Sequence, residues 1–384
     1  MKPKSAPRSR LLAALEEAIK KATNPIEAQC LRAECAALLA RQGQLERAQS
    51  VIDELNAQLA WQPHNNLVRG WVALAEGLHG YYSVIGIGGH EQLGLAYQLA
   101  RDSGAAGTRL RATTAAWLAN LAFGDEDAAR MAALIREALD TAASEHRGAR
   151  ARATLVAGYA YHFAGQSARA QPWYEASRRH AIAEGDEAHL SALMHNQAWM
   201  RAAQVRMSLL FDAKGANDDD KHALAQALMG AESIGHYDAG IGTASLGSLV
   251  PTLRAQVLTA QGRWAEALEL FAANFDSALD EGLKRIVACL LADRALCEWH
   301  VGHADQARVL AGAAEQALAE PIDTDDRTLA LARLAQVREA LGESSLAAQH
   351  REASQRLYAQ HVEQQQHIVA LLDEALAGLD PKQL

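Results

Sequence analysis

The chain has 384 residues and a formal net charge of -9, with 49% hydrophobic and only 5% aromatic residues. This acidic balance argues against a general nucleic-acid-binding protein, because such proteins need a concentrated basic surface. Strong helix formers such as Ala, Leu, Glu, Gln and Arg dominate, whereas the runs of Val, Ile and Thr that mark strands are nearly absent. The sequence therefore predicts an all-α protein with ample material for a core.

The N-terminal segment is basic and contains prolines, and residues 1–9 are predicted to be a disordered tail. It lacks the apolar stretch of a signal peptide, and no run of 18 apolar residues follows it. We therefore expect a soluble, cytoplasmic protein without membrane contact. Four cysteines, none in a CxxC pair, are expected to be small core residues in a reducing compartment: Cys30, Cys35, Cys289 and Cys297.

A pattern of Gly followed five residues later by Ala recurs along the chain with a period near 40 residues. The Gly is expected to end one helix, because it adopts a left-handed backbone at low cost, and the Ala to face that helix from the next. The six Gly–Ala pairs are Gly43–Ala48, Gly124–Ala129, Gly165–Ala170, Gly262–Ala267, Gly302–Ala307 and Gly342–Ala347.

A second marker, usually a small residue, precedes each Gly by seven positions and is expected where two helices cross closely. Extending the period gives eight positions: Ala36, Gly77, Trp117, Gly158, Ala198, Ala255, Ala295 and Ala335. Eight helix pairs are therefore predicted, at about 11–59, 65–104, 108–144, 147–184, 187–234, 247–280, 282–319 and 324–360. The repeat domain spans 10–360 with an insertion near 205–247, and a C-terminal capping helix and tail follow at 361–384.

Three segments could suggest a ligand site, but the sequence favours a structural role for each. The Gly-rich stretch 85–90 lacks the Lys and the preceding strand of a phosphate loop, which predicts a turn. His300 and His303 are separated by a helix-ending Gly, which argues against a metal site. The acidic residues Asp323 and Asp325, with Asp326, are expected to form a solvated helix N-terminus, because the Gly and Glu of a calcium loop are missing.

No sequence motif of a nucleophilic or metal-dependent enzyme is present: GxSxG, HExxH and GxxxxGK[ST] are all absent. We therefore expect no catalytic residues, no metal and no cofactor, and a protein that is not an enzyme. Catalytic groups that assemble only in space remain the alternative.

The repeat markers resemble those of the tetratricopeptide repeat over residues 25–360. The closest match runs from 151 to 177, where Gly158, Tyr161, Gly165, Ala170 and Tyr174 occupy the small, aromatic, Gly, Ala and aromatic positions. The family unit has 34 residues, so a unit near 40 implies longer helices, as in the sensing arrays of bacterial signalling proteins. The resemblance implies a right-handed superhelical solenoid of about eight helix-turn-helix repeats.

In this resemblance the first helix of each repeat lines the concave surface. The register from the small residue then predicts a binding cluster in the fourth and fifth repeats, because rigid aromatic groups with a few polar ones suit recognition. Its members are Arg152, Tyr159, His162, Phe163, His195, Asn196 and Trp199. The alternative is that some of these, notably Phe163 and Trp199, only fill space between helices.

Three functions follow from these expectations. The first is a scaffold or adaptor that binds a protein or peptide in an open groove. The second is a sensing solenoid for a small molecule or signal peptide, which requires a superhelix curled tightly enough to enclose a pocket. The third is an enzyme subunit, which requires a buried titratable pair in a cleft. The sequence indicates no particular oligomeric state.

Overall fold

The computed structural model describes residues 9–61, 65–83, 88–211, 218–241, 247–281 and 283–384. Over these ranges the protein is all-α, as expected, with 17 α-helices and two short 3-10 helices. The helices are α1 (Arg10–Lys21), α2 (Pro25–Arg41), α3 (Leu45–Leu59), α4 (Asn66–Ser83), α5 (His90–Asp102), η1 (Gly104–Gly107), α6 (Thr108–Gly124), α7 (Ala128–Thr141), α8 (Arg147–Phe163), α9 (Ser167–Glu184), α10 (Glu187–Phe211), α11 (Asp218–Ile241), α12 (Leu249–Ala260), α13 (Trp264–Asp280), η2 (Leu283–Ile286), α14 (Val287–His300), α15 (Ala304–Ala317), α16 (Thr324–Ala340) and α17 (Ser344–Ala375).

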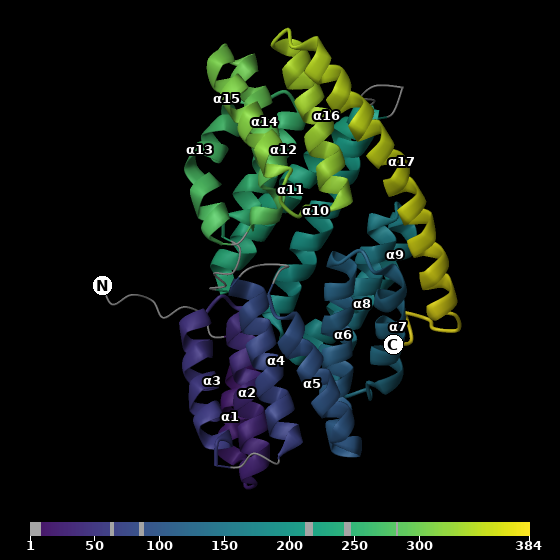
Figure 1. Cartoon of the computed structure of the whole chain (residues 1–384). Helices are drawn as coiled ribbons and strands as arrows, with labels where there is room; N and C mark the ends of the chain where they lie inside the picture. Colours follow the sequence, from purple (N-terminus) through teal and green to yellow (C-terminus); the bar gives the residue numbers. More distant parts are fainter. Residues whose placement is uncertain (1–8, 62–64, 84–87, 212–217, 242–246, 282) are drawn as a thin grey trace.

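The helices pack mainly against their neighbours in the chain, in sequential pairs (Figure 1). Eight pairs, from α2 with α3 to α16 with α17, correspond to the eight pairs predicted from the period. The prediction did not separate α1, which is a helix of its own ahead of the first pair. Ser9 and Asn24 cap the starts of α1 and α2 by accepting backbone N–H groups, so the two helices are distinct units.

The predicted Gly positions have the expected backbone in all but the third pair. Gly43, Gly165, Gly262, Gly302 and Gly342 all have positive φ angles between 74° and 95°.

In the third pair Gly124 instead belongs to α6, and Glu126 takes the left-handed conformation with φ 58°. The repeat register there is therefore shifted by two residues. The residue seven positions before Glu126 is the buried Ala119, which holds the small-residue position that the sequence analysis gave to Trp117.

Small residues allow close helix crossings within the pairs. A Cβ atom on Gly77 of α4 would lie 2.7 Å from Cγ of Leu93 on α5. Gly94, on the same α5, has nothing within 4 Å of a Cβ placed there. Alanine substitutions at these two positions therefore distinguish the effect of close packing from the intrinsic effect of glycine on helix stability.

Replacing Gly77 with alanine is expected to lower the free energy of unfolding by about 1–3 kcal/mol, because α5 must move to admit the methyl group. The matched variant Gly94→Ala is expected to raise it by up to about 1 kcal/mol, since alanine favours the helix and meets no neighbour. Urea unfolding followed by circular dichroism measures both changes. Equal effects of the two substitutions would contradict the close crossing.

The insertion expected near 205–247 coincides with long helices: α10 has 25 residues and α11 has 24. The segments 212–217 and 242–246 lie outside the described residues, as do 1–8 of the predicted tail and 84–87, which include the first half of the Gly-rich stretch. At the C-terminus, α17 is continuous from Ser344 to Ala375, so no break marks the division expected at residue 360.

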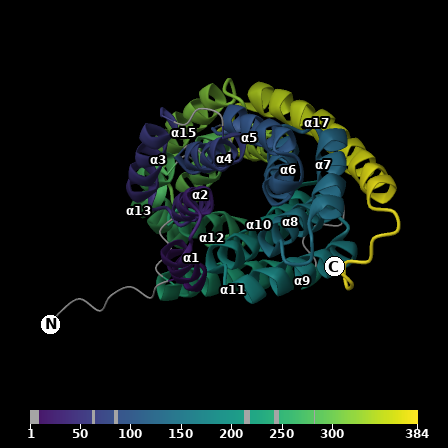
Figure 2. The ribbon, with the colours of Figure 1, turned by 90° about the horizontal axis from the view of Figure 1, so that it is seen from below.

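Contacts between distant parts of the chain bring the pairs around a common axis (Figure 2). At the first closure, Arg41 of α2 binds both carboxylate oxygens of Asp186, which precedes α10, at 2.9 and 2.7 Å. Glu187 of α10 accepts hydrogen bonds from the side chains of Ser9 and Arg10 at the start of α1. The N-terminal helices are therefore held against the junction of α9 and α10, about half the chain away.

A second closure joins the two halves of the chain. Glu126, after α6, accepts hydrogen bonds from the backbone and side chain of Thr324 at the start of α16. Arg285 in η2 donates to the carbonyl of Gly124 at 3.0 Å. In Figure 1, α17 runs along the outside of the molecule toward α7, and its Asp373 accepts a hydrogen bond from Tyr161 of α8.

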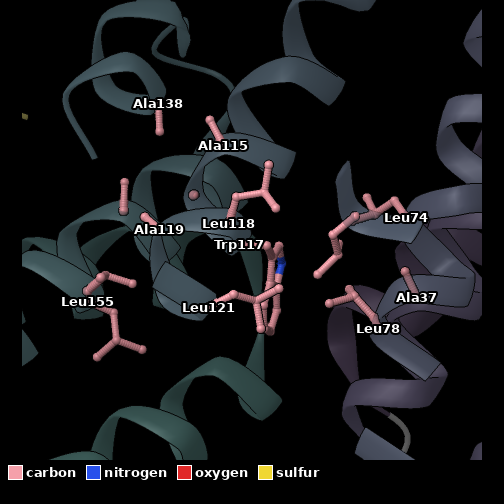
Figure 3. Close-up of a cluster of buried hydrophobic side chains, with 14 of the residues drawn as sticks. Ala37, Leu74, Leu78, Ala115, Trp117, Leu118, Ala119, Leu121, Ala138 and Leu155 are labelled. Carbon is pink, nitrogen blue, oxygen red and sulfur yellow. The ribbon is translucent and has the colours of Figure 1, made fainter. Parts of the chain in front are cut away.

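The largest hydrophobic cluster joins the N-terminal pairs to α17. Figure 3 shows part of it, with Trp117 of α6 beside Leu121 and facing Leu74 and Leu78 of α4. Three of the four cysteines are buried and Cys30 is half-buried, and all four are free thiols, in line with the expected core role. Among the helices that the structure describes, none is long and apolar enough to span a membrane.

Candidate ligand-binding cavity

A cavity of about 250 Å³ lies where the two closures meet. Every described helix that contributes to its wall is the first helix of a pair, or a short segment leading into one. Its lining residues are Arg41, Tyr81, Tyr82, Asn120, Leu121, Phe123, Gly124, Arg152, Tyr159, Ala188, Ser191, Ala192, His195, Asn196, Trp199, Leu249, Leu283, Arg285, Ile286, Asp323 and Asp326. The first helices of the pairs thus provide the lining of this cavity.

Five of the seven residues predicted as a binding cluster line this cavity: Arg152, Tyr159, His195, Asn196 and Trp199. Phe163 lies next to it, in a smaller cavity of about 80 Å³ that it shares with Tyr159 and Trp199. The structure therefore brings six of the seven side chains into one neighbourhood.

The seventh, His162, does not join this cluster. Its side chain is 4% exposed, and its Nδ1 atom lies 3.2 Å from the Tyr174 hydroxyl on α9, on the side of α8 where the helices of its own pair meet. Burial lowers the pKa of His162 to about 4, so the ring is neutral at physiological pH. Its contacts make it a packing residue rather than a ligand-binding one.

Aromatic rings form much of the cavity wall. The chain has 5 Phe, 7 Trp and 8 Tyr residues, and five of these 20 line the cavity. Tyr81 and Tyr82 are in edge-to-face contact at 5.1 Å between ring centroids, and Phe123 lies 4.4 Å from Tyr159 in a tilted arrangement. Such rings offer a rigid apolar surface with hydroxyl groups at its edge.

Arg152 has the most unusual environment of the lining residues. The side chain is 5% exposed, and its guanidinium carbon lies 3.8 Å from the Trp117 ring centroid. Its Nε and Nη2 atoms are buried without a hydrogen-bond partner in the described part of the chain. Burial lowers the pKa of Arg152, but an arginine keeps its charge in proteins. The cavity wall therefore contains a buried cation that no neighbouring carboxylate neutralises by direct contact.

Also at the cavity, the acidic residues before and within the first turn of α16 are not solvated as expected. Asp326 is buried, and Asp323 pairs with Arg285. Burial raises the pKa of Asp323 to about 6 and that of Asp326 well above its ordinary value, with the nearby carboxylates adding to both effects. The expectation failed because η2 and the end of α6 cover this helix terminus. The raised pKa values of Asp323 and Asp326 favour the neutral carboxylic acid and so reduce the negative charge of this part of the wall.

Ser191, His195 and Asp238 form a hydrogen-bonded set beside the cavity. The Ser191 hydroxyl donates to one oxygen of Asp238 at 2.6 Å, and Nε2 of His195 lies 3.0 Å from the other oxygen. A nucleophilic triad requires the hydroxyl to contact the imidazole, and here both groups contact the carboxylate instead. The arrangement fixes the His195 ring and leaves its buried Nδ1 atom, which lacks a partner, as a polar group of the cavity wall.

The two histidines at 300 and 303 have separate structural contacts. His300 stacks on Trp264 at 4.0 Å between ring centroids, and His303 pairs with Glu298 at 2.8 Å. Within the described ranges, no group of three or more His, Cys, Asp or Glu side chains is placed to hold a metal ion.

Sequence reasoning missed several lining residues, among them Arg41, Asn120, Phe123 and Arg285. The first three stand at positions one, four or five after the small residue of their repeat, as Tyr159 and Phe163 do in the fourth. Asn120 and Phe123 follow from this rule only when Ala119 replaces Trp117 as the marker. Arg285 lies in η2, ahead of a helix pair, where the repeat pattern gives no signal.

In comparisons with known proteins, no family model matches the chain and no curated protein resembles it closely enough to count as a relative.

Proposed function

We propose that this protein binds a small organic molecule in its central cavity and works as a small-molecule sensor or carrier. In this proposal the helix pairs form a tetratricopeptide-like, right-handed superhelical solenoid. The solenoid curls until contacts between distant helices surround the ligand. The observation that carries the proposal is that first helices from seven of the eight pairs line the cavity.

The closures favour a small ligand over a peptide lying in an open groove. The pairing of Arg41 with Asp186 and that of Glu126 with Thr324 hold distant helices against each other, next to residues that line the cavity. A long peptide would need these contacts to separate. The cavity volume of about 250 Å³ is close to the lower end of the range typical for small-molecule sites, which begins near 300 Å³.

Burial of the inner helix faces also favours a small ligand over a peptide or protein partner. On the first helices of the second and seventh pairs, the side chains of Trp71, Leu74 and Asp293 are buried. A binding groove for a protein partner needs such positions to be accessible. Half-buried Ala192, Asn196 and Trp199 line the open space of the cavity.

The substitution Ala192→Phe tests the proposal, because it places a phenyl group in the cavity without removing a polar contact. We expect the unmodified protein to retain a low-molecular-weight compound after incubation with a small-molecule extract of the cells that make it. Native mass spectrometry detects such a compound as a mass added to the folded chain, and the variant is expected to lose it.

The matched control is Ala57→Phe, at an exposed position on the outer helix α3. It adds the same group far from the cavity and is expected to leave retention unchanged. Circular dichroism establishes that both variants are folded. Retention of the same compound by Ala192→Phe and the unmodified protein alike would place the ligand outside the cavity and contradict the proposal.

A further inference from the structure

The cavity holds polar atoms that the protein itself does not satisfy. Arg152 presents two guanidinium nitrogens without a hydrogen-bond partner among the described residues, and His195 presents Nδ1 in the same condition. Both side chains line the cavity and both are about 95% buried. Buried polar groups are nearly always hydrogen-bonded, and a buried charge without a counter-charge is costly. Such groups next to an open space indicate that the missing partner is a ligand.

The charged groups around Arg152 indicate the charge of that ligand. Asp186 is a carboxylate with an electrostatic effect on Arg152. Both of its oxygens are already bound by Arg41, and one also accepts the backbone N–H of His189 at 3.0 Å. Arg285, also in the wall, is a further cation and pairs with Asp323, and burial raises the pKa of Asp326 well above its ordinary value, which favours its neutral form. The wall thus has a positive excess at Arg152, although the whole chain is acidic.

From this arrangement we propose that the cavity selects a small aromatic carboxylate, whose negative group is bound by Arg152 and whose ring lies against the aromatic wall. Arginine binds a planar carboxylate with two parallel hydrogen bonds, which suits a guanidinium that has spare donors. Tyr81, Tyr82 and Trp199 supply the flat apolar surface. This inference rests on the proposed function, which requires only that some small molecule occupies the cavity.

The proposal also assigns a role to the contact with Trp117. The ring lies under the guanidinium, with 3.8 Å between the guanidinium carbon and the ring centroid, and so holds it in place without neutralising it. A cation held in this way is positioned before the ligand arrives. Removing the cation should therefore not destabilise the ligand-free protein, because in that state the buried charge of Arg152 has no counter-charge.

The experiment measures binding by isothermal titration calorimetry to the full chain, with benzoate, phenylacetate and indole-3-acetate as probes. Each is compared with its neutral primary amide, which has nearly the same shape. At least one carboxylate is expected to bind about 10-fold or more tightly than its amide, since a charge-assisted hydrogen bond is lost in the amide. The variant Arg152→Met is expected to bind both members of that pair equally weakly, and to melt at the same temperature as the unmodified ligand-free protein or higher.

The outcomes separate this inference from the proposed function. Equal binding of acids and amides, with loss of both in Ala192→Phe, would overturn anion selection and leave the cavity as a neutral site. Tighter binding of phenyl phosphate than of every carboxylate would overturn the carboxylate class. A large drop in the melting temperature of ligand-free Arg152→Met would overturn the ligand-binding role and make Arg152 a structural residue. In that case Arg152→Lys, which keeps the charge, should restore the melting temperature without restoring the preference for the carboxylate over its amide.

Discussion

Replacing Asp293 with alanine is expected to lower the free energy of unfolding by about 3–5 kcal/mol, because it leaves two buried arginines without their counter-charge. Asp293 of α14 is fully buried, and its two oxygens bind Arg206 of α10 at 2.6 Å and Arg333 of α16 at 2.8 Å. One carboxylate therefore links three first helices from the fifth, seventh and eighth pairs. Urea unfolding followed by circular dichroism and tryptophan fluorescence measures the change.

The control is Asp305→Ala, which removes a carboxylate from the surface of α15. Asp305 is fully exposed and pairs with Arg308 at 3.3 Å. An exposed pair of this kind contributes between zero and about 1 kcal/mol, so its loss should be barely measurable. Similar effects of the two substitutions would show that the Asp293 network is not a structural link. The buried contacts of Asp293 thus assign it to the core.

The repeat period predicted the helix pairs because it reflects local chemistry. A left-handed Gly after a helix and a small residue at a crossing act within one hairpin, so a single sequence reveals them. The same pattern predicted that Tyr159, His195, Asn196 and Trp199 share a face with Arg152. In the third pair, Glu126 and not Gly124 takes the left-handed conformation, so the pattern places the end of the helix two residues too early.

The closure of the chain on itself could not be predicted in the same way. It depends on single pairs of residues, such as Arg41 with Asp186, that are 145 positions apart and carry no periodic signal. Burial of the acidic residues at α16 is likewise a consequence of distant segments that cover them. Composition and period therefore determine which side chains point inward, while tertiary contacts determine whether the inward surface is an open groove or a cavity.

The pairing of Arg41 with Asp186 is expected to act as a structural clasp, because both side chains are largely buried and the two carboxylate oxygens are held by one guanidinium group. Asp186→Asn keeps a side-chain oxygen that can accept the His189 N–H at the start of α10 and removes only the charge. We expect this variant, and separately Arg41→Met, to lose about 3–5 kcal/mol of unfolding free energy, since each leaves one buried charge without its partner.

A double-mutant cycle distinguishes a coupled pair from two independent losses. The variant carrying both substitutions removes the charges together, so its cost should be smaller than the sum of the single costs by about 1.5–3 kcal/mol. The exposed pair of Arg351 and Glu339, at 3.4 Å, provides a cycle whose coupling should stay below about 1 kcal/mol. Hydrogen exchange gives the location: amides of α1 and α2 should exchange faster in Asp186→Asn, while those of α14 and α15 keep their rates, because the clasp fastens the N-terminal helices to the α9–α10 junction. Additive costs in the cycle, or uniform exchange along the chain, would mean that the ring of helices is held closed by apolar packing and not by this ion pair.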